Sequence, residues 1–180
     1  MALFGLFRSR PHEREAFALY GAAVAAARAP AMFGQLGIPD TLDGRFDIVA
    51  LHVSLLIRRI RRDADPRGPK LAQAVFDAMF ADMDVNLREM GVSDLAVGKR
   101  VRSMWEAFHG RAAAYEAALD DADAATLPPV LARNVWRGQA PEGAPEALAL
   151  QVRAIAAALA AQPFASLLAG EATFPEAVAA

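Results

Sequence analysis

Residues 42–62 run LDGRFDIVALHVSLLIRRIRR. At the 3.6-residue spacing of an α-helix, the polar side chains of this stretch fall on one stripe and nearly all other positions are apolar. The stripe consists of Asp47, Ser54, Arg58, Arg61 and Arg62. A helix that is apolar around most of its circumference is expected at the centre of a fold. We therefore expect this helix to be buried, with the stripe in solvent and His52 on the apolar side.

Helical periodicity continues on both sides of this stretch, interrupted by proline and glycine. No segment alternates apolar and polar residues as a strand does. We therefore expect an all-α fold, a single-domain helical bundle of about six to seven helices with no sheet. The remaining helices are expected at about residues 11–28, 70–90, 96–120, 128–137 and 145–161.

Local signals place some of the helix ends. Asp40 or Thr41 is expected to cap the central helix, and Gly91 is expected to follow the end of the 70–90 helix. On this division residues 1–11 form an amphipathic N-terminal segment, residues 12–162 form the helical domain, and residues 163–180 form an Ala-rich C-terminal tail.

The composition excludes several kinds of chemistry. The 180 residues include no cysteine, which excludes disulfides, thiolate metal sites and thiol catalysis. The net charge of −2 gives no overall attraction to DNA or to anionic membranes. No nucleophile lies in a recognisable catalytic motif. We therefore expect a protein that holds another protein and is not an enzyme.

Charge is nevertheless arranged in blocks. Residues 58–70 carry six basic and two acidic side chains, residues 77–94 carry five acidic and one basic, and residues 99–111 carry four basic and one acidic. The favoured interpretation is that opposite blocks pair across a helix hairpin. For the 58–70 block, which has fewer obvious internal partners, contact with ribosomal RNA or anionic lipid and a solvated helix end are both left open.

The N-terminus carries a short apolar run. This run is too short for a signal peptide, its charges follow it, and no later apolar stretch reaches the roughly 18 residues that span a bilayer. We expect a bacterial, cytoplasmic protein, with peripheral contact at the inner face of the cytoplasmic membrane as an open alternative. The predicted membrane-contact residues are Phe4, Leu6, Phe7 and Arg8. Docking of the same residues on the protein's own core is the competing interpretation.

The 70–90 helix breaks its own pattern. Its apolar face, extended towards the C-terminus, meets Asp82, Asn86 and Glu89. Either the face that packs on the core shifts around the helix along its length, or these three polar side chains lie in an interface with another molecule. The predicted partner-binding surface consists of Asp82, Asn86, Glu89, Phe80, Met83, Lys99 and Arg111.

The 96–120 helix has two distinct faces. One is a core stripe that includes Trp105, Phe108 and Tyr115. The opposite face is lined by small residues, namely Ser103, Ala107, Gly110, Ala114 and Ala117. Small residues allow close approach of another helix. A helix of the same chain is the favoured occupant of this face, and a helix of a partner is the alternative.

Metal and haem sites have only weak sequence support. Glu106 and His109 form a single Glu-x-x-His pair, whereas di-iron bundles use two. A lone His52 on an apolar face is typical of a hydrogen-bonded core histidine. We expect no metal and no cofactor. A helical haem- or metal-handling protein that uses these residues, and a non-catalytic scaffold, remain alternative functions.

Several motifs together resemble the ubiquinol–cytochrome c chaperone family, over about residues 12–160. These motifs are FADMDVNLREMG at 80–91, VGK at 97–99, AFHGR at 107–111 with Tyr115 after it, and PDTLDGRF at 39–46 with Leu51-His52 beyond it. One departure is His109, where the family often has tyrosine. That departure argues against a metal role for His109.

The resemblance implies an all-α assembly factor of the respiratory cytochrome bc complex without catalytic activity. Mitochondrial members of this family bind newly made cytochrome b near the ribosomal exit tunnel and work with a small partner subunit. The implied client of this chain is therefore cytochrome b. Whether a bacterial member also contacts the ribosome or a small helical partner subunit is left open by the resemblance.

Overall fold

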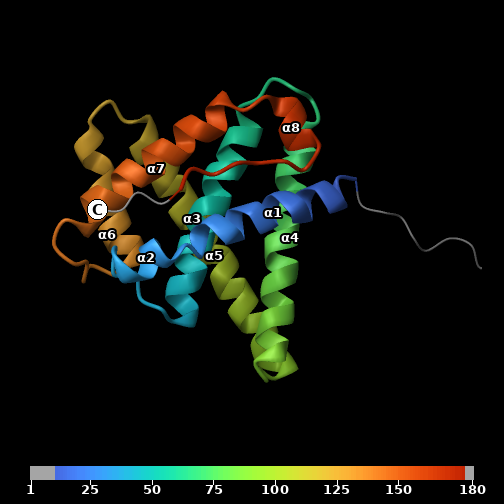
Figure 1. Ribbon diagram of the computed structural model, residues 1–180. Helices are drawn as coiled ribbons and strands as arrows, with labels where there is room; N and C mark the ends of the chain where they lie inside the picture. Colours follow the sequence, from blue (N-terminus) through green and yellow to red (C-terminus); the bar gives the residue numbers. More distant parts are fainter. Residues whose placement is uncertain (1–10, 177–180) are drawn as a thin grey trace, which may run out of the picture.

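A computed structural model describes residues 11–176 (Figure 1). This part of the chain contains eight α-helices, one 3-10 helix and no strand, which confirms the all-α prediction. The elements are α1 (Glu13–Ala27), α2 (Pro30–Gly34), α3 (Leu42–Arg61), α4 (Gly68–Glu89), α5 (Asp94–Asp120), η1 (Ala124–Thr126), α6 (Leu127–Val135), α7 (Ala144–Ala161) and α8 (Phe164–Leu168). The five-residue α2 lies where the sequence pattern indicated only a break.

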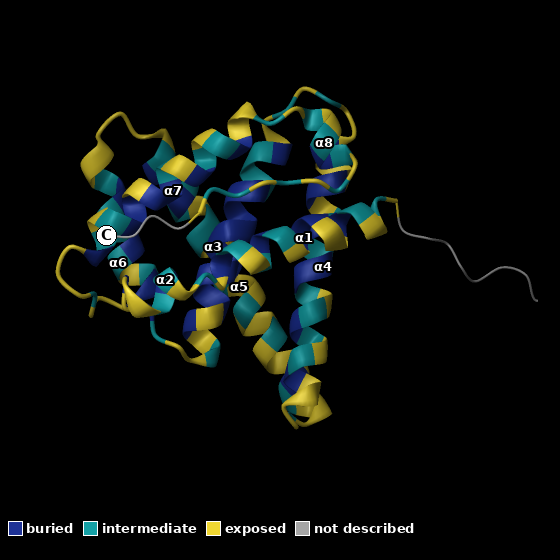
Figure 2. Cartoon of the chain, in the orientation of Figure 1, coloured by how far each residue is buried: buried dark blue, intermediate teal, exposed yellow. Residues whose placement is uncertain are grey.

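Helix α3 lies at the centre of the bundle and contacts α1, α4, α5, α6 and α7. Figure 2 shows it as buried along most of its length. The prediction of a buried central helix is thus confirmed, but the prediction that its whole polar stripe lies in solvent is partly wrong. Asp47 is only 1% exposed and Ser54 is also buried. The surrounding helices cover these two positions, so the solvated part of the stripe is confined to the arginines at the C-terminal end.

Thr41 caps α3 as predicted, because its Oγ1 accepts a hydrogen bond from the Gly44 backbone N–H at 3.1 Å. Asp40 instead pairs with the Arg45 guanidinium. Gly44 is buried against the preceding turn, and a Cβ added there would lie 2.0 Å from the Pro39 carbonyl oxygen. This contact explains why a glycine stands in the first turn of the central helix.

Substitution of Gly44 by alanine is expected to lower the free energy of unfolding by about 1–3 kcal/mol, as overpacking against a rigid backbone group does. Gly98 provides the control, since a Cβ there meets nothing within 4 Å. Urea unfolding of Gly44→Ala and Gly98→Ala measures the difference. Equal stabilities of the two variants would contradict the close contact.

Helices α4 and α5 form a long hairpin whose closed end projects from the rest of the molecule (Figure 1). Gly91 joins them with a φ of 79°, and the Val92 N–H bonds to the Leu87 carbonyl at 3.1 Å. This geometry ends α4 at a left-handed glycine, as predicted. One side of α4 packs on α1 and the other on α3 and α5, so the hairpin is anchored to the bundle mainly through α4.

Among residues 11–176, α7 is the one helix long and apolar enough to cross a bilayer by length and composition. It exceeds the length that we expected of any apolar stretch. In the structure α7 packs on α6 and α3, with Leu148, Val152 and Ile155 buried. An apolar helix that packs in this way fits the core of a bundle.

The segment after α7 returns to the core. Leu167 in α8 is buried, and the Phe174 ring lies 5.9 Å from the His52 ring. Part of the predicted tail thus contributes to packing around the central helix. The predicted membrane-contact residues Phe4, Leu6, Phe7 and Arg8 lie outside the described residues.

Candidate partner-binding surface

The apolar members of the predicted partner surface face the protein's own core. Met83 is buried, and the half-buried Phe80 packs with its ring centre 4.7 Å from that of Phe76 and 6.2 Å from that of Phe108. The face of α4 that contacts the core therefore shifts around the helix towards its C-terminus. This is one of the two alternatives that the sequence left open.

Asp82 is held inside the molecule by a neighbouring helix. The Tyr20 hydroxyl on α1 donates a hydrogen bond to Asp82 Oδ2 at 2.7 Å. Burial and this hydrogen bond raise the pKa of Tyr20 far above its usual value, so the phenol keeps its proton. Asn86 Nδ2 in turn donates to the Asp82 backbone carbonyl at 2.7 Å. Asp82 therefore joins α1 to α4, and Asn86 is hydrogen-bonded within α4 itself.

Glu89 and Lys99 lie exposed on the α4–α5 hairpin, near its projecting end. Neither forms an ion pair within the described part of the chain. Of the predicted partner-binding residues, these two are the ones whose charges remain available to another molecule.

Arg111 is used internally. Its guanidinium pairs with Asp47 Oδ1, and the Arg137 guanidinium approaches Asp47 Oδ2 at 3.3 Å. Burial raises the pKa of Asp47, while the positive charges of Arg111 and Arg137 oppose that shift. The sequence could not reveal this cluster, because its members come from α3, α5 and the turn after α6.

A groove of about 690 Å³ lies between α3, α4 and α5. Its apolar lining comprises Leu55, Phe76, Trp105, Phe108, Ala112 and Leu119. The sequence placed Trp105 in the core stripe of α5, but the side chain is 47% exposed at the edge of this groove. A large aromatic side chain half open to solvent beside an apolar groove is typical of binding sites for other proteins.

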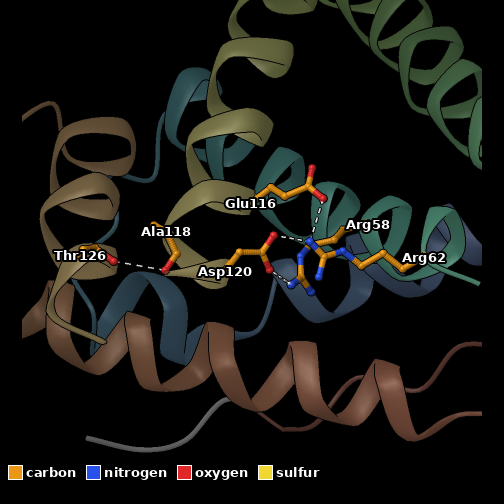
Figure 3. A network of polar contacts seen from close by, with 6 residues as sticks. All are labelled: Arg58, Arg62, Glu116, Ala118, Asp120 and Thr126. Carbon is orange, nitrogen blue, oxygen red and sulfur yellow. Dashed lines mark hydrogen bonds and ion pairs between the residues drawn. The ribbon is translucent and has the colours of Figure 1, made fainter. Parts of the chain in front are cut away.

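Positive charge lies at one end of the groove. Arg58 and Arg61 both line it, and Arg61 forms no ion pair within residues 11–176. Figure 3 shows Arg58 and Arg62 converging on Asp120, with Glu116 beside Arg62. These two arginines lower the pKa of Asp120 and tie the end of α3 to the end of α5. The network fixes this end of the groove and leaves Arg61 as the available cation.

The charge blocks do not pair across the α4–α5 hairpin as the favoured interpretation expected. Arg88 pairs with Asp84 and Asp94, within the acidic block itself, and Arg102 pairs with Glu106 within the basic block. Short-range pairs between successive helical turns replace the long-range pattern. The 58–70 block is also largely paired, partly over a long range with Glu116 and Asp120 of α5 and partly within the block with Asp63 and Asp65.

The small-residue face of α5 remains open within the described chain. Ser103, Gly110 and Ala117 are exposed, and a Cβ added to Gly110 would meet nothing within 4 Å. Ala107 and Ala114 are half-buried, so the favoured interpretation, in which a helix of the same chain covers this face, is wrong for the three exposed positions. The other helices pack on the opposite side of α5, where Phe108 and Tyr115 are buried.

The histidines differ sharply in environment. His52 is buried, and its Nδ1 lies 2.8 Å from the Ile48 carbonyl oxygen. His109 is exposed, with its ring centre 4.3 Å from that of Trp105. Glu106 bonds to Arg102 instead. Within residues 11–176, no three His, Asp or Glu side chains gather as metal ligands would.

Burial lowers the pKa of His52 to about 4, against about 6.5 in an unfolded chain. Between these two values the unfolded state binds a proton that the folded state excludes. The contribution of His52 to the free energy of unfolding is therefore expected to be greatest above pH 6.5 and to fall by about 1.4 kcal/mol per unit as the pH drops towards 4. Urea unfolding at pH 7.5 and pH 5 measures this loss.

The variant His52→Leu, which cannot titrate, should lose about 2 kcal/mol less than the parent between these two pH values, if it folds. His109→Gln is the matched control, since it removes an exposed histidine and should keep the parent's pH dependence. An unchanged pH dependence in His52→Leu would rule out this assignment.

The chain matches known proteins over most of its length. The model of the ubiquinol–cytochrome c chaperone family matches residues 34–174. A protein of Xenopus laevis described as ubiquinol-cytochrome-c reductase complex assembly factor 1 is 25% identical over 105 residues, which are 58% of this chain and 50% of that protein. The match thus spans about half the length of this curated relative.

Similarity in structure is more extensive. The crystal structure of the Cbp3 homolog from Brucella abortus superposes with a TM-score of 0.81 at 33% sequence identity. The superposition covers 94% of this chain and 93% of that one. The arrangement of helices described above is therefore shared with a solved bacterial protein.

Proposed function

Because this chain belongs to the ubiquinol–cytochrome c chaperone family, we propose that it holds newly made cytochrome b while the cytochrome bc complex is assembled. The observation that carries this proposal is the groove between α3, α4 and α5 with its half-exposed Trp105. Exposure of this aromatic surface to water does not stabilise the monomer, whereas binding of a partner that covers it is favoured by the apolar area removed from solvent.

The groove has the dimensions of a helix-binding site. It is lined by α5 from Trp105 to Leu119, a distance of about 21 Å at 1.5 Å per residue. An apolar helix of a client can lie along such a surface, with its side chains at i, i+3 and i+7 against the aromatic wall. Arg61 at one end offers a charged hydrogen bond to a carboxylate of the client.

The proposal is tested by removing the gene from its source cell and restoring it on a plasmid. We expect loss of the chain to lower the amount of assembled cytochrome bc complex, measured from the b- and c-type haem absorbance of membranes. The wild-type chain should restore this absorbance, and Trp105→Ala should restore it poorly. Unchanged haem absorbance after deletion would overturn the proposed function.

A further inference from the structure

A second cleft, of about 400 Å³, lies between the start of α1 and the first half of α4. Its alanines are Ala74, Ala78 and Ala81 on α4, and Phe17 of α1 borders them. Phe17 is 45% exposed although it belongs to the apolar pattern of α1. A trough lined by alanines leaves room for large side chains that this part of the chain does not supply.

The undescribed N-terminal residues begin at this cleft. Pro11, the first residue of the described structure, is itself part of the cleft wall. His12 follows with a left-handed φ of 64°, so the backbone bends sharply where it enters α1. Phe7 is only four residues before Pro11, within a reach of about 13 Å.

We propose that the segment from Leu3 to Phe7 packs into this cleft, with Phe4 and Phe7 against the alanines of α4. The two phenylalanines are three residues apart in the sequence, a spacing that would bring both onto one face of a helical turn. Burying the two rings would also cover the exposed part of Phe17 and so complete an apolar cluster that the described residues leave open.

Charges at the rim favour the same occupant. Glu13 and Asp77 line the cleft, and neither has a cationic partner among the described residues, since Asp77 accepts its hydrogen bond from Gln73. Arg8 and Arg10 stand between the apolar segment and α1 in the sequence, so the proposed docking would bring two positive charges to this rim. Lys70, also at the cleft, is the one opposing charge.

Tethering favours this site over a membrane. A segment joined to its site by only three residues, 8–10, experiences a high effective concentration, so docking needs little intrinsic affinity. A membrane contact through the same few side chains would be weak and reversible, because a single short anchor gives only marginal binding. The intramolecular cleft is therefore the preferred location of Phe4 and Phe7.

The absence of cysteine from the chain allows a direct test. In the full-length protein, Phe7→Cys is combined with Ala74→Cys in the cleft, and the pair is oxidised mildly. The control combines Phe7→Cys with Ala154→Cys, an exposed position on α7, which does not line the cleft. We expect the first pair to form an intramolecular disulfide in most molecules, measured by thiol labelling and mass, and the control pair in few.

Two further arms decide between the cleft and a bilayer. Asp77→Lys should reduce the disulfide yield of the first pair at least several-fold by reversing a rim charge, whereas Asp94→Lys, far along the hairpin, should leave it unchanged. Vesicles that contain anionic lipid should not change the yield. Equal yields for the two cysteine pairs, or suppression of the disulfide by vesicles, would overturn the proposal.

Discussion

Replacement of Arg111 by alanine is expected to lower the free energy of unfolding by about 3–5 kcal/mol, the usual effect of removing one partner of a buried ion pair. Asp47, only 1% exposed, would then keep a single cation, Arg137, at 3.3 Å. A loss of this size is a large fraction of the stability of a typical domain. Urea or thermal unfolding measures it directly.

Two controls make this prediction specific to the Asp47 pair. Arg102→Ala removes an exposed arginine of the same helix together with its ion pair to Glu106. It should change the free energy of unfolding by less than about 1 kcal/mol, because exposed ion pairs contribute little to stability. Asp47→Asn in the Arg111→Ala background should recover part of the loss, since it removes the uncompensated charge. Equal free energies of unfolding for Arg111→Ala and Arg102→Ala would contradict the assignment of Arg111 as a stabilising partner of Asp47.

Replacement of Trp105 by alanine is expected to weaken client binding by about 30-fold to 1000-fold, equivalent to the 2–4 kcal/mol of a central aromatic interface residue. The effect on folding should be small, because the side chain is 47% exposed in the free protein. Affinity for purified client fragments, measured by titration calorimetry, and a thermal melt of the same sample separate the two effects.

Leu150→Ala is the matched control for Trp105. Leu150 is 72% exposed on α7 and lies outside the groove, so its truncation also removes an exposed apolar side chain. We expect its affinity for the client to equal that of the parent. A Trp105→Ala variant that melts early and binds normally once folded would place Trp105 in the core and not in an interface.

The features that the sequence predicted correctly are those fixed by local signals. The burial of α3 follows from its apolar periodicity, the cap at Thr41 from one hydroxyl at the right position, and the end of α4 from Gly91. Each of these depends on residues within one helix and its immediate ends.

The features that the sequence missed depend on how helices distant in the chain are placed. Asp47 belongs to a polar stripe by its angle on α3, and only the approach of Arg111 from α5 and Arg137 from the turn after α6 makes it internal. Trp105 lies on the same side of α5 as the buried Phe108, but α4 does not cover it there and a groove remains.

The resemblance to a family led to the proposed function, and the structure changed which residues we propose for it. Asp82 and Asn86 belong to the motif that carries the resemblance, yet Asp82 bonds to Tyr20 of α1 and Asn86 bonds within α4. An unusual polar residue on an apolar face is explained equally well by an internal hydrogen bond and by an interface. Only the position of Tyr20 distinguishes the two.

The most direct test of the proposed client groove is site-specific photo-crosslinking during synthesis of cytochrome b. A photoreactive phenylalanine analogue is placed at His109, which lines the groove beside Trp105, and at Leu150 as the position outside it. We predict that newly made cytochrome b crosslinks to the chain from position 109 and not from position 150. Crosslinks from position 150 alone, or from neither position while the chain is present and folded, would contradict a client groove between α3, α4 and α5.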